Sequence, residues 1–531
     1  MEPTNISLHP GEKTSGTHST IWLDTISQQN FETLTSDVET DVLVIGGGIA
    51  GISTAYCLVK AGKKVILIED GLLYSGETGR TTAHIVNALD DRYSDLIKMH
   101  GKENARLVAD SHSAAIDFIE RASRELQTDC DFTRLNGYLF LHDNDTQKTL
   151  DDELKATHEA GIQTTMLDHV PGIPAEKGSC LQFPAQAQFH PLKYLNGLVK
   201  YISENGGTIY THTHAESFKE QEVKANGFSI KATHIVVATN SPINNMLTHH
   251  TKQHAYRTYV IGGLVPAGAY QQALWWDTGD PDTKWVIEPY HYVRLQQYNN
   301  RYDLLIAGGE DHKTGQEDDE NLTAEERYQR LEKWTRQRFD KIKDITYQWS
   351  GQVLEPVDSL AFIGKNPSDE HTYVITGESG NGMTYGTIGG MLVSDLILGN
   401  QNPWTNLYDP GRITLMATGA FLEEAGNMAL QYGDFLKAGD VKSTGELANG
   451  TGAIMNEGGH KVAVYKDEQG AVYAYTAVCP HLGCVVQWNH DEKSFDCPCH
   501  GSRFTCEGKV INGPALSDLA PHHLNHQTDN K

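Results

Sequence analysis

The sequence predicts an α/β unit followed by a small all-β unit. A buried strand runs into a glycine-rich turn and a helix from residue 41, and strand-like and helix-like segments alternate from there to about residue 400. From about residue 441 the segments become short alternating strands joined by tight turns. We therefore expect a polar arm over 1–35, the α/β unit over 36–400, a linker with helical character over 401–440 and the all-β unit over 441–525.

Length and charge limit the partners that this chain can have. Its 531 residues allow a core large enough to fold without disulfides or metals. The formal net charge of −26 opposes binding to nucleic acid or to an anionic membrane surface. The N-terminus lacks the basic and apolar segments of a secretory signal, and the uncharged run over 42–59 contains successive glycines, so we expect no membrane span and a cytoplasmic protein.

The first strand of the α/β unit leads into a dinucleotide-binding fingerprint. The strand over 42–45 is followed by G-x-G-x-x-G and a helix. Gly46 permits the tight turn, Gly48 lets a pyrophosphate approach the backbone, and Gly51 lets the helix pack against the strand. Glu69 ends the next strand, where a ribose hydroxyl needs a carboxylate partner. The expected cofactor contacts in this region are Gly46, Gly48, Ile49, Ala50, Gly51 and Glu69.

Three later segments suit other parts of the same cofactor. The loop after Glu69 is rich in small and hydroxyl residues, a strand and turn run over 235–240, and a glycine-opened helix follows the strand over 373–376. Such turns and helix N-termini present N–H groups to a pyrophosphate or to the pyrimidine edge of an isoalloxazine. The candidate contacts here are Gly76, Thr78, Thr81, Thr82, Ala238, Gly380, Gly382, Met383 and Thr384.

These segments together resemble the glycine oxidase/D-amino-acid oxidase superfamily of FAD-dependent oxidoreductases. The resemblance covers about residues 36–400 and rests on the sequences VIGGGIAGIS, ETGRTTAH, IVVATN and GESGNGMTYG. Asn240 stands where the family's turn usually has glycine. The resemblance implies a Rossmann-type FAD domain interleaved with an α+β substrate lobe that carries an antiparallel sheet. It also implies FAD rather than NAD, and an amine or amino acid substrate that is oxidised at a C–N bond.

Two further residues are candidates for the site. Arg294 alternates with Trp285, Tyr290 and Tyr292 in a strand-like segment, and its guanidinium could clamp the carboxylate of a substrate. The alternative is a core strand with a surface arginine. His84 lies in the region where some members of the wider superfamily attach flavin covalently through a histidine, and the alternative is a hydrogen-bonded or surface histidine.

Five of the eight cysteines lie within 28 residues near the C-terminus. Two boxes there, C-x-H and C-x-x-H, pair Cys479 with His481 and Cys497 with His500. Four such ligands could hold zinc, but zinc fingers usually place both cysteines before both histidines. One cysteine and one histidine from each box suit a [2Fe–2S] centre with two thiolates on one iron and two imidazoles on the other.

The two boxes resemble those of the Rieske proteins, and specifically the cytochrome bc-type boxes, over about residues 430–520. The resemblance assigns the iron ligands and a disulfide between the two cluster loops: the ligands are Cys479, His481, Cys497 and His500, and the disulfide joins Cys484 to Cys499. Ser502 matches a serine that hydrogen-bonds a bridging sulfur. Phe504 stands where the family has a tyrosine, so we expect one fewer hydrogen bond to sulfur and a lowered potential.

The combination of a flavin site and a one-electron centre suggests how electrons flow. The whole chain resembles bacterial flavoproteins that join an amino-acid-oxidase-like domain to a C-terminal Rieske domain. We expect an FAD-dependent dehydrogenase of a small amine or amino acid that passes electrons through the Rieske [2Fe–2S] cluster to an unknown external acceptor. The alternatives are an NAD(P)H-fed reductase that serves an oxygenase, for which the sequence shows no second glycine fingerprint, and a non-catalytic redox relay or sensor.

Overall fold

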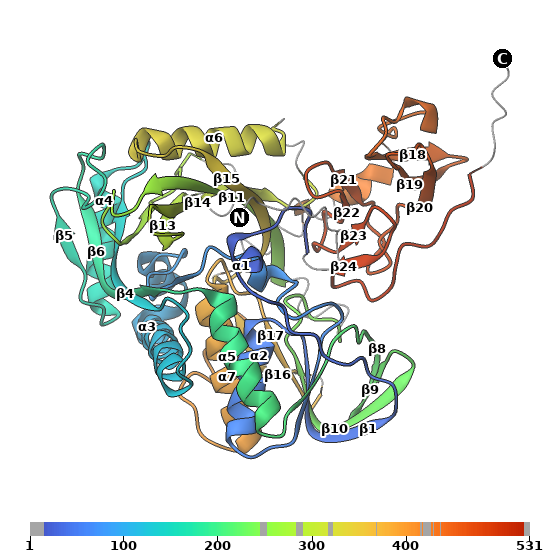
Figure 1. Ribbon diagram of the computed structural model, residues 1–531, viewed down its shortest axis with the longest axis horizontal. Coiled ribbons are helices and arrows are strands. Elements are labelled where there is room, and N and C mark those ends of the chain that lie inside the picture. The colour runs from blue at the N-terminus through green and yellow to red at the C-terminus, as the bar shows by residue number, and fades with distance from the viewer. Residues whose placement is uncertain are drawn as a thin grey trace.

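The computed structural model describes residues 15–244, 252–282, 290–316, 322–367, 369–414, 417, 426–427, 430–435 and 437–524. Two lobes, each with its own sheet, form the larger α/β part, and a smaller all-β part lies beside them (Figure 1). This is the fold class that the sequence predicts. None of the helices within these ranges has the length and apolar composition that a membrane crossing requires.

The first lobe is built on a mainly parallel sheet in the order β16-β17-β10-β1-β2-β7, with β8 and β9 attached through β10. The C-terminal halves of the central strands are apolar and buried, and helices α2, α5 and α7 cover one face of the sheet. The strands are β1 (Val38–Ile45), β2 (Val65–Ile68), β7 (Thr208–Tyr210), β8 (Ala215–Lys219), β9 (Glu222–Ala225), β10 (Phe228–Val237), β16 (Phe362–Lys365) and β17 (Thr372–Thr376). The helices are α2 (Ile49–Lys60), α5 (Pro191–Glu204) and α7 (Gly382–Leu398).

The second lobe is a mainly antiparallel sheet in the order β15-β11-β14-β13-β12-β4-β6-β3, with β5 paired to β6. Helix α6 packs on one face, and Thr323 and Glu326 form a capping box at its N-terminus. The strands are β3 (His84–Ile85), β4 (Thr133–Phe140), β5 (Thr165–Leu167), β6 (Cys180–Gln188), β11 (Gln253–Pro266), β12 (Leu274–Asp277), β13 (Tyr292–Gln297), β14 (Tyr302–Lys313) and β15 (Ile345–Pro356). The helices are α3 (Tyr93–Glu125), α4 (Gln147–Glu159) and α6 (Ala324–Arg338).

The all-β part contains a three-stranded and a four-stranded antiparallel sheet. Its core gathers the cysteines of both boxes with apolar side chains such as Phe495 and Phe504. The strands of the first sheet are β18 (Thr451–Glu457), β19 (His460–Lys466) and β20 (Val472–Thr476). The strands of the second are β21 (Gln487–Asn489), β22 (Ser494–Asp496), β23 (Arg503–Thr505) and β24 (Val510–Asn512).

The described part of the N-terminal arm packs against the larger part of the molecule. Helix α1 (Ile21–Asp24) carries Trp22, which is fully buried and whose Nε1 donates to the carbonyl of Thr81 at 2.6 Å. The polar composition of residues 1–35 did not predict this contact, because one large aromatic side chain is enough to anchor a short helix. The helical character expected for the linker falls mainly on residues outside the described ranges. Of the described ones, 426–427 and 430–431 are α-helical, and Tyr432–Phe435 forms a 3-10 turn, η5.

Candidate functional site

A cavity of about 730 Å³ lies between the two lobes and reaches the all-β part. The glycine turn after β1, the loop over 76–82 and the turn before α7 line one side of it. Strands β11, β14 and β15 line the other side, and the segment from β24 to residue 516 closes one end. The volume falls within the roughly 300–1,000 Å³ that small-molecule and cofactor sites occupy. Three segments far apart in sequence therefore meet at one cavity, as the sequence predicts for a single cofactor.

The glycine turn has the geometry that a bound dinucleotide needs. Gly46 has a φ of +112°, and a Cβ there would lie 2.2 Å from the carbonyl oxygen of Ala238. A Cβ on Gly51 would lie 2.0 Å from the carbonyl oxygen of Gly46, so helix α2 packs directly on the turn. Thr78 lies over the helix start, where its hydroxyl accepts from Ile49 N at 3.1 Å. These residues fit a pyrophosphate at the N-terminus of α2.

Glu69 lies at the cavity and joins the glycine turn to the loop that follows β2. Its carboxylate accepts from Gly47 N at 2.5 Å and from Gly71 N at 3.1 Å. Burial raises the pKa of Glu69 to about 7, although both N–H groups oppose the shift. The carboxylate is therefore held at the position where the sequence places a ribose partner.

The other predicted cofactor contacts divide into two groups. Those that line the cavity are Gly46, Gly48, Ile49, Ala50, Glu69, Gly76, Thr78, Thr81, Thr82, Ala238, Gly380, Gly382 and Met383. Gly51 and Thr384 do not line it. Gly51 packs against the carbonyl of Gly46, and the hydroxyl of Thr384 lies 2.9 Å from Nδ1 of His112 and donates to the carbonyl of Asn381 at 3.0 Å. Thr384 comes one residue after Met383 on α7, and its side chain points into the core. The structure therefore does not support the direct cofactor contact expected at Thr384.

Arg294 is not placed to clamp a substrate carboxylate. It is fully buried on β13 behind the first loop, and it does not line the cavity. Its guanidinium donates to the carbonyls of Ala83 at 2.8 Å and Phe189 at 3.0 Å, and to the side chain of Gln296 at 2.5 Å. Burial lowers its pKa to about 9. Both earlier interpretations are therefore corrected: Arg294 is neither a clamp nor a surface residue, and it braces the loop that carries His84.

His84 faces the cavity from β3 and is hydrogen-bonded on both ring nitrogens. Nδ1 lies 3.1 Å from the hydroxyl of Thr82, and Nε2 lies 3.4 Å from the carbonyl oxygen of Val293. Burial, with Arg294 as a second cause, lowers its pKa to about 3. The imidazole is therefore neutral and fixed in orientation beside the site.

A group of carboxylates on the substrate-lobe side of the cavity was not anticipated from the sequence. The hydroxyl of Ser379 lies between Asp91 and Glu355, 2.7 Å from Oδ2 of the first and 2.5 Å from Oε2 of the second. Burial raises the pKa of Asp90 to about 7 and that of Asp311 to about 6. The adjacent aspartates Asp90 and Asp91 can be seen in the sequence. That they lie at the same cavity as Asp311 on β14 depends on contacts between distant segments of the chain.

Aromatic side chains lie beside these carboxylates. Tyr290 and Tyr292 have ring centroids 5.3 Å apart, and Trp276 lines the same region. The hydroxyl of Tyr292 lies 2.9 Å from that of Thr258, which in turn hydrogen-bonds to Asp311. The predicted alternation of Tyr290 and Tyr292 does bring both to the cavity, whereas Trp285 lies outside the described residues.

The four predicted iron ligands lie together at the tips of two loops of the all-β part. Cys479 and Cys497 are buried thiols close enough to hydrogen-bond to each other. The rings of His481 and His500 are nearly perpendicular, with centroids 5.0 Å apart. Each box closes on itself, since Cys479 N donates to the carbonyl of Cys484 at 2.8 Å and Cys497 N to that of Ser502 at 2.8 Å. Two thiols and two imidazoles in this arrangement fit a [2Fe–2S] centre.

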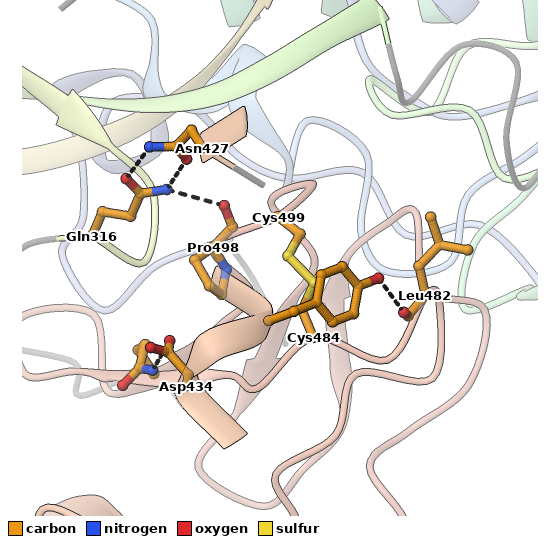
Figure 2. The surroundings of a disulfide bond; sticks show 9 residues. Gln316, Asn427, Asp434, Leu482, Cys484, Pro498 and Cys499 are labelled. Carbon is orange, nitrogen blue, oxygen red and sulfur yellow. Dashed lines mark hydrogen bonds between the residues drawn. A yellow bond between two sulfur atoms is a disulfide. The ribbon is translucent and has the colours of Figure 1, made fainter. Parts of the chain in front are cut away.

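A disulfide between Cys484 and Cys499 joins the two loops, as the resemblance implies. Figure 2 shows it beside Pro498, with Gln316 and Asn427 beyond the proline on the side away from the disulfide. The sulfurs of this pair and of Cys497 lie within 4.8 Å of one another. Because the pair is oxidised, its sulfurs tie the loops together and are not iron ligands.

The hydrogen bonds around the cluster site lead to a prediction about its potential. Ser502 hydrogen-bonds to the Cys479 thiol, while Phe504 is fully buried on β23 and can donate nothing. Phe504→Tyr is expected to raise the potential by about 50 mV, the value of one hydrogen bond that strengthens on reduction. Ser502→Ala is the opposite control and should lower it. A redox titration followed by EPR measures both, and an unchanged or lower potential in Phe504→Tyr would contradict the prediction.

Strand β11 forms a wall between the cavity and the cluster site. His254, Tyr256 and Thr258 line the cavity. The residues between them face the opposite way: a Cβ on Gly501, next to His500, would lie 2.4 Å from Ala255 Cβ, and Arg257 lies 3.6 Å from Glu492. This follows from the pleat, which turns successive side chains to opposite faces of a sheet. The two predicted cofactor sites are therefore separated by one strand.

The fold and both sites define an oxidoreductase with two redox centres, and comparison with known proteins gives its family. Residues 41–396 match the family of FAD dependent oxidoreductases, and residues 438–523 match the Rieske [2Fe-2S] domain. The chain belongs to this FAD-dependent oxidoreductase family and carries a C-terminal Rieske domain. It is an enzyme that binds FAD in the larger part and a [2Fe–2S] cluster in the smaller part.

Three relatives illustrate how the resemblance is distributed. YhfW of Bacillus subtilis, described as a Rieske 2Fe-2S iron-sulfur protein, is 31% identical over 94% of this chain and 96% of its own. Gamma-glutamylputrescine oxidoreductase of Escherichia coli is 25% identical over 70% of this chain and 86% of its own. The crystal structure of glycine oxidase from Geobacillus kaustophilus superimposes with a TM-score of 0.56 at 14% identity, over 71% of this chain and 99% of its own. YhfW is similar to this chain over nearly its whole length, while the other two proteins are similar only to the larger, FAD-binding part of this chain.

Proposed function

We propose that this protein is a dehydrogenase of a small, positively charged amine that delivers electrons through the Rieske cluster to an external one-electron acceptor. The observation that carries the proposal is the shared wall, since β11 has the cavity on one side and the second cluster box on the other. When bound, FAD accepts two electrons from a C–N bond as a hydride, and a Rieske centre carries one electron at a time. The site residues hold the substrate, exclude water and separate the two centres.

The cavity favours an amine over an amino acid. Its substrate-lobe side carries Asp90, Asp91 and Asp311. Arg294 lies behind the loop, and Arg92, which does line the cavity, donates to the carbonyl of Thr278. Asp311 Oδ1 is buried and makes no hydrogen bond within the described residues. An ammonium group would offer it a partner, and the rings of Tyr290 and Tyr292 would add cation–π attraction. The E. coli relative, whose name gives a putrescine derivative, is consistent with this class.

An anaerobic substrate panel tests the proposed function. Purified holoprotein is mixed without oxygen with primary and secondary amines, with amino acids, and with NADH and NADPH, and the flavin spectrum is followed. We expect amines to bleach the flavin and the reduced Rieske EPR signal to follow. Rapid bleaching by NADH or NADPH would instead support a reductase, and flavin bleaching without any reduction of the cluster would refute the electron route.

Asp311 gives a prediction that separates binding from chemistry. Asp311→Asn removes the carboxylate but keeps its size, and should raise KM for an amine about tenfold, equal to about 1.4 kcal/mol of lost interaction, with a smaller change in kcat. Asp303→Asn is a matched control on the same strand, because Asp303 lies away from the cavity and accepts from Gly268 N at 3.0 Å. Steady-state kinetics with the best amine measures both, and equal KM values would contradict the role of Asp311.

A further inference from the structure

The Rieske domain is joined to the FAD domain by a buried ion network. Glu492, in the turn between β21 and β22, is fully buried, and its Oε1 lies 2.5 Å from Nη2 of Arg80 and 3.6 Å from Nη1 of Arg257. The hydroxyl of Ser350 on β15 also donates to it. Burial alone would raise the pKa of Glu492, but Arg80 and Arg257 outweigh burial and hold it well below its usual range. A charged group at this position has its partners only while the two domains are together.

The N-terminal arm closes over the same interface. Thr17 N donates to Oε2 of Glu492 at 2.6 Å, and His18 lies 3.0 Å from Asp491. Arg503, whose guanidinium is buried in the Rieske domain, donates to the carbonyl of Ser15 at 2.6 Å. Residues 15–18 therefore hold a domain that begins more than 400 residues later in the chain.

The second cluster box is seated on the sheet that walls the cavity. Gln316 donates to the carbonyl of Pro498 at 3.4 Å (Figure 2). The side chain of Gln352 on β15 donates to the carbonyl of Gly501 at 3.0 Å. These contacts fix the backbone on both sides of His500. His254 lies on the cavity side of β11, and its neighbour Ala255 faces Gly501, next to His500, where a Cβ on the glycine would lie 2.4 Å from Ala255 Cβ.

The far end of the Rieske domain covers the nucleotide end of the cavity. Asn512 on β24 lies 3.4 Å from Glu77, which belongs to the loop over 76–82. The carbonyl of Leu516 lies 3.3 Å from Nε2 of His214, next to the turn that holds Glu69. Separation of the domains would open this end of the cofactor cavity, so the Rieske domain is part of the wall around FAD.

We propose that the Rieske domain stays docked throughout turnover, and that His254 is the positioning residue across which electrons pass from the flavin cavity to the cluster at His500. The proposal rests on the proposed function only for the source of the electrons. Each transfer oxidises the reduced flavin by one electron and reduces the cluster by one. The cluster must then give its electron to an external one-electron carrier before the second transfer, and the flavin protons pass to solvent.

The first test replaces the residue between the two centres. In His254→Phe, FAD is photoreduced anaerobically with EDTA as the electron donor, so that no substrate is needed, and cluster reduction is followed by absorbance and rapid-freeze EPR. We expect cluster reduction to slow at least tenfold, while the dithionite-reduced EPR spectrum and the FAD content stay as in the wild type. His522→Gln is the control. His522 belongs to the Rieske domain, lies far from β11 in sequence and bonds to Glu457, so this substitution should leave the rate of cluster reduction unchanged.

Equal rates in His254→Phe and the wild type would overturn the role of His254. The second test addresses docking, because the rate of a transfer that needs domain motion falls as solvent viscosity rises. We expect the rate of cluster reduction after photoreduction to be the same with and without glycerol, and a rate that falls with viscosity would overturn permanent docking. Since neither measurement uses an amine, a failed substrate panel would refute the proposed function without affecting this inference.

Discussion

Glu492→Gln is expected to lower the free energy of unfolding by about 3–5 kcal/mol, the usual effect of removing one partner from a buried ion pair. The substitution leaves Arg80 and Arg257 in the interface without the carboxylate that neutralises them, and both guanidinium groups are almost fully excluded from solvent. The effect is large mainly because the substitution leaves buried positive charge without a partner, and only to a smaller extent because one attraction is lost. Denaturant unfolding, followed by FAD fluorescence and by cluster absorbance, measures it.

The matched control is Asp518→Asn in the same domain. Asp518 pairs with Lys509 at 2.7 Å, but both side chains are largely exposed, so the expected change is about 0–1 kcal/mol. In the wild type we expect FAD release and cluster loss in one transition, and in Glu492→Gln we expect the two to separate. Similar stability losses in the two variants would contradict the importance of the interface network.

The same carboxylate predicts a dependence on pH. The folded-state pKa of Glu492 lies well below its unfolded value, so its contribution to stability is complete above the ordinary carboxyl pKa of about 4.3 and is lost as pH falls below that value. Glu492→Gln has no such group, so its stability should fall less steeply in acid. Unfolding curves at a series of pH values below 5 measure this, and parallel pH profiles would show that other groups dominate.

Gly46→Ala is expected to weaken FAD binding by about 100-fold or more. A Cβ at this position would lie 2.2 Å from the carbonyl oxygen of Ala238, and the φ of +112° disfavours any residue with a side chain. Overpacking costs about 1–3 kcal/mol and backbone strain of this kind about 1–3 kcal/mol more, while 1.4 kcal/mol corresponds to a factor of ten. Fluorescence titration of the apoprotein with FAD measures the affinity, and the Rieske EPR signal reports whether the chain has folded.

Gly62→Ala separates the two causes of this effect. Gly62 also has a positive φ, of +81°, but a Cβ there would have nothing within 4 Å. It lies just after α2, away from the cavity, so the substitution introduces strain without a clash. We expect a modest loss of stability and unchanged FAD affinity. If Gly46→Ala bound FAD as tightly as Gly62→Ala, the glycine turn would not be under the steric constraint described above.

The parts of the sites that could be predicted are those that short contiguous motifs define. The glycine turn needs only neighbouring residues to take its shape, and each cluster box closes through hydrogen bonds between residues a few positions apart. Thr384 and Arg294 were placed in the site wrongly because a motif gives position along the chain but not the direction of a side chain within the folded core. In both cases tertiary partners, His112 and the carbonyl of Ala83, decide that direction.

The carboxylate group and the domain interface could not be predicted for a related reason. Asp90 and Asp311 lie on different segments of the chain and meet only in the folded molecule. Glu492 and Arg80 are separated by 412 positions, and nothing near either residue signals the other. Isolated acidic and basic residues of this kind usually lie in solvent, so their burial in the interior could not be expected from their neighbours in the chain.

The alternation of side chains along β11 constrains how this protein can evolve. Because cavity-facing and cluster-facing residues alternate, the insertion or deletion of a single residue early in the strand would exchange the two sets and place Ala255 and Arg257 on the flavin side. A change of two residues would preserve the facing of every side chain. In a set of homologous chains that keep both domains, length changes ahead of Thr258 in this strand should therefore occur in even numbers.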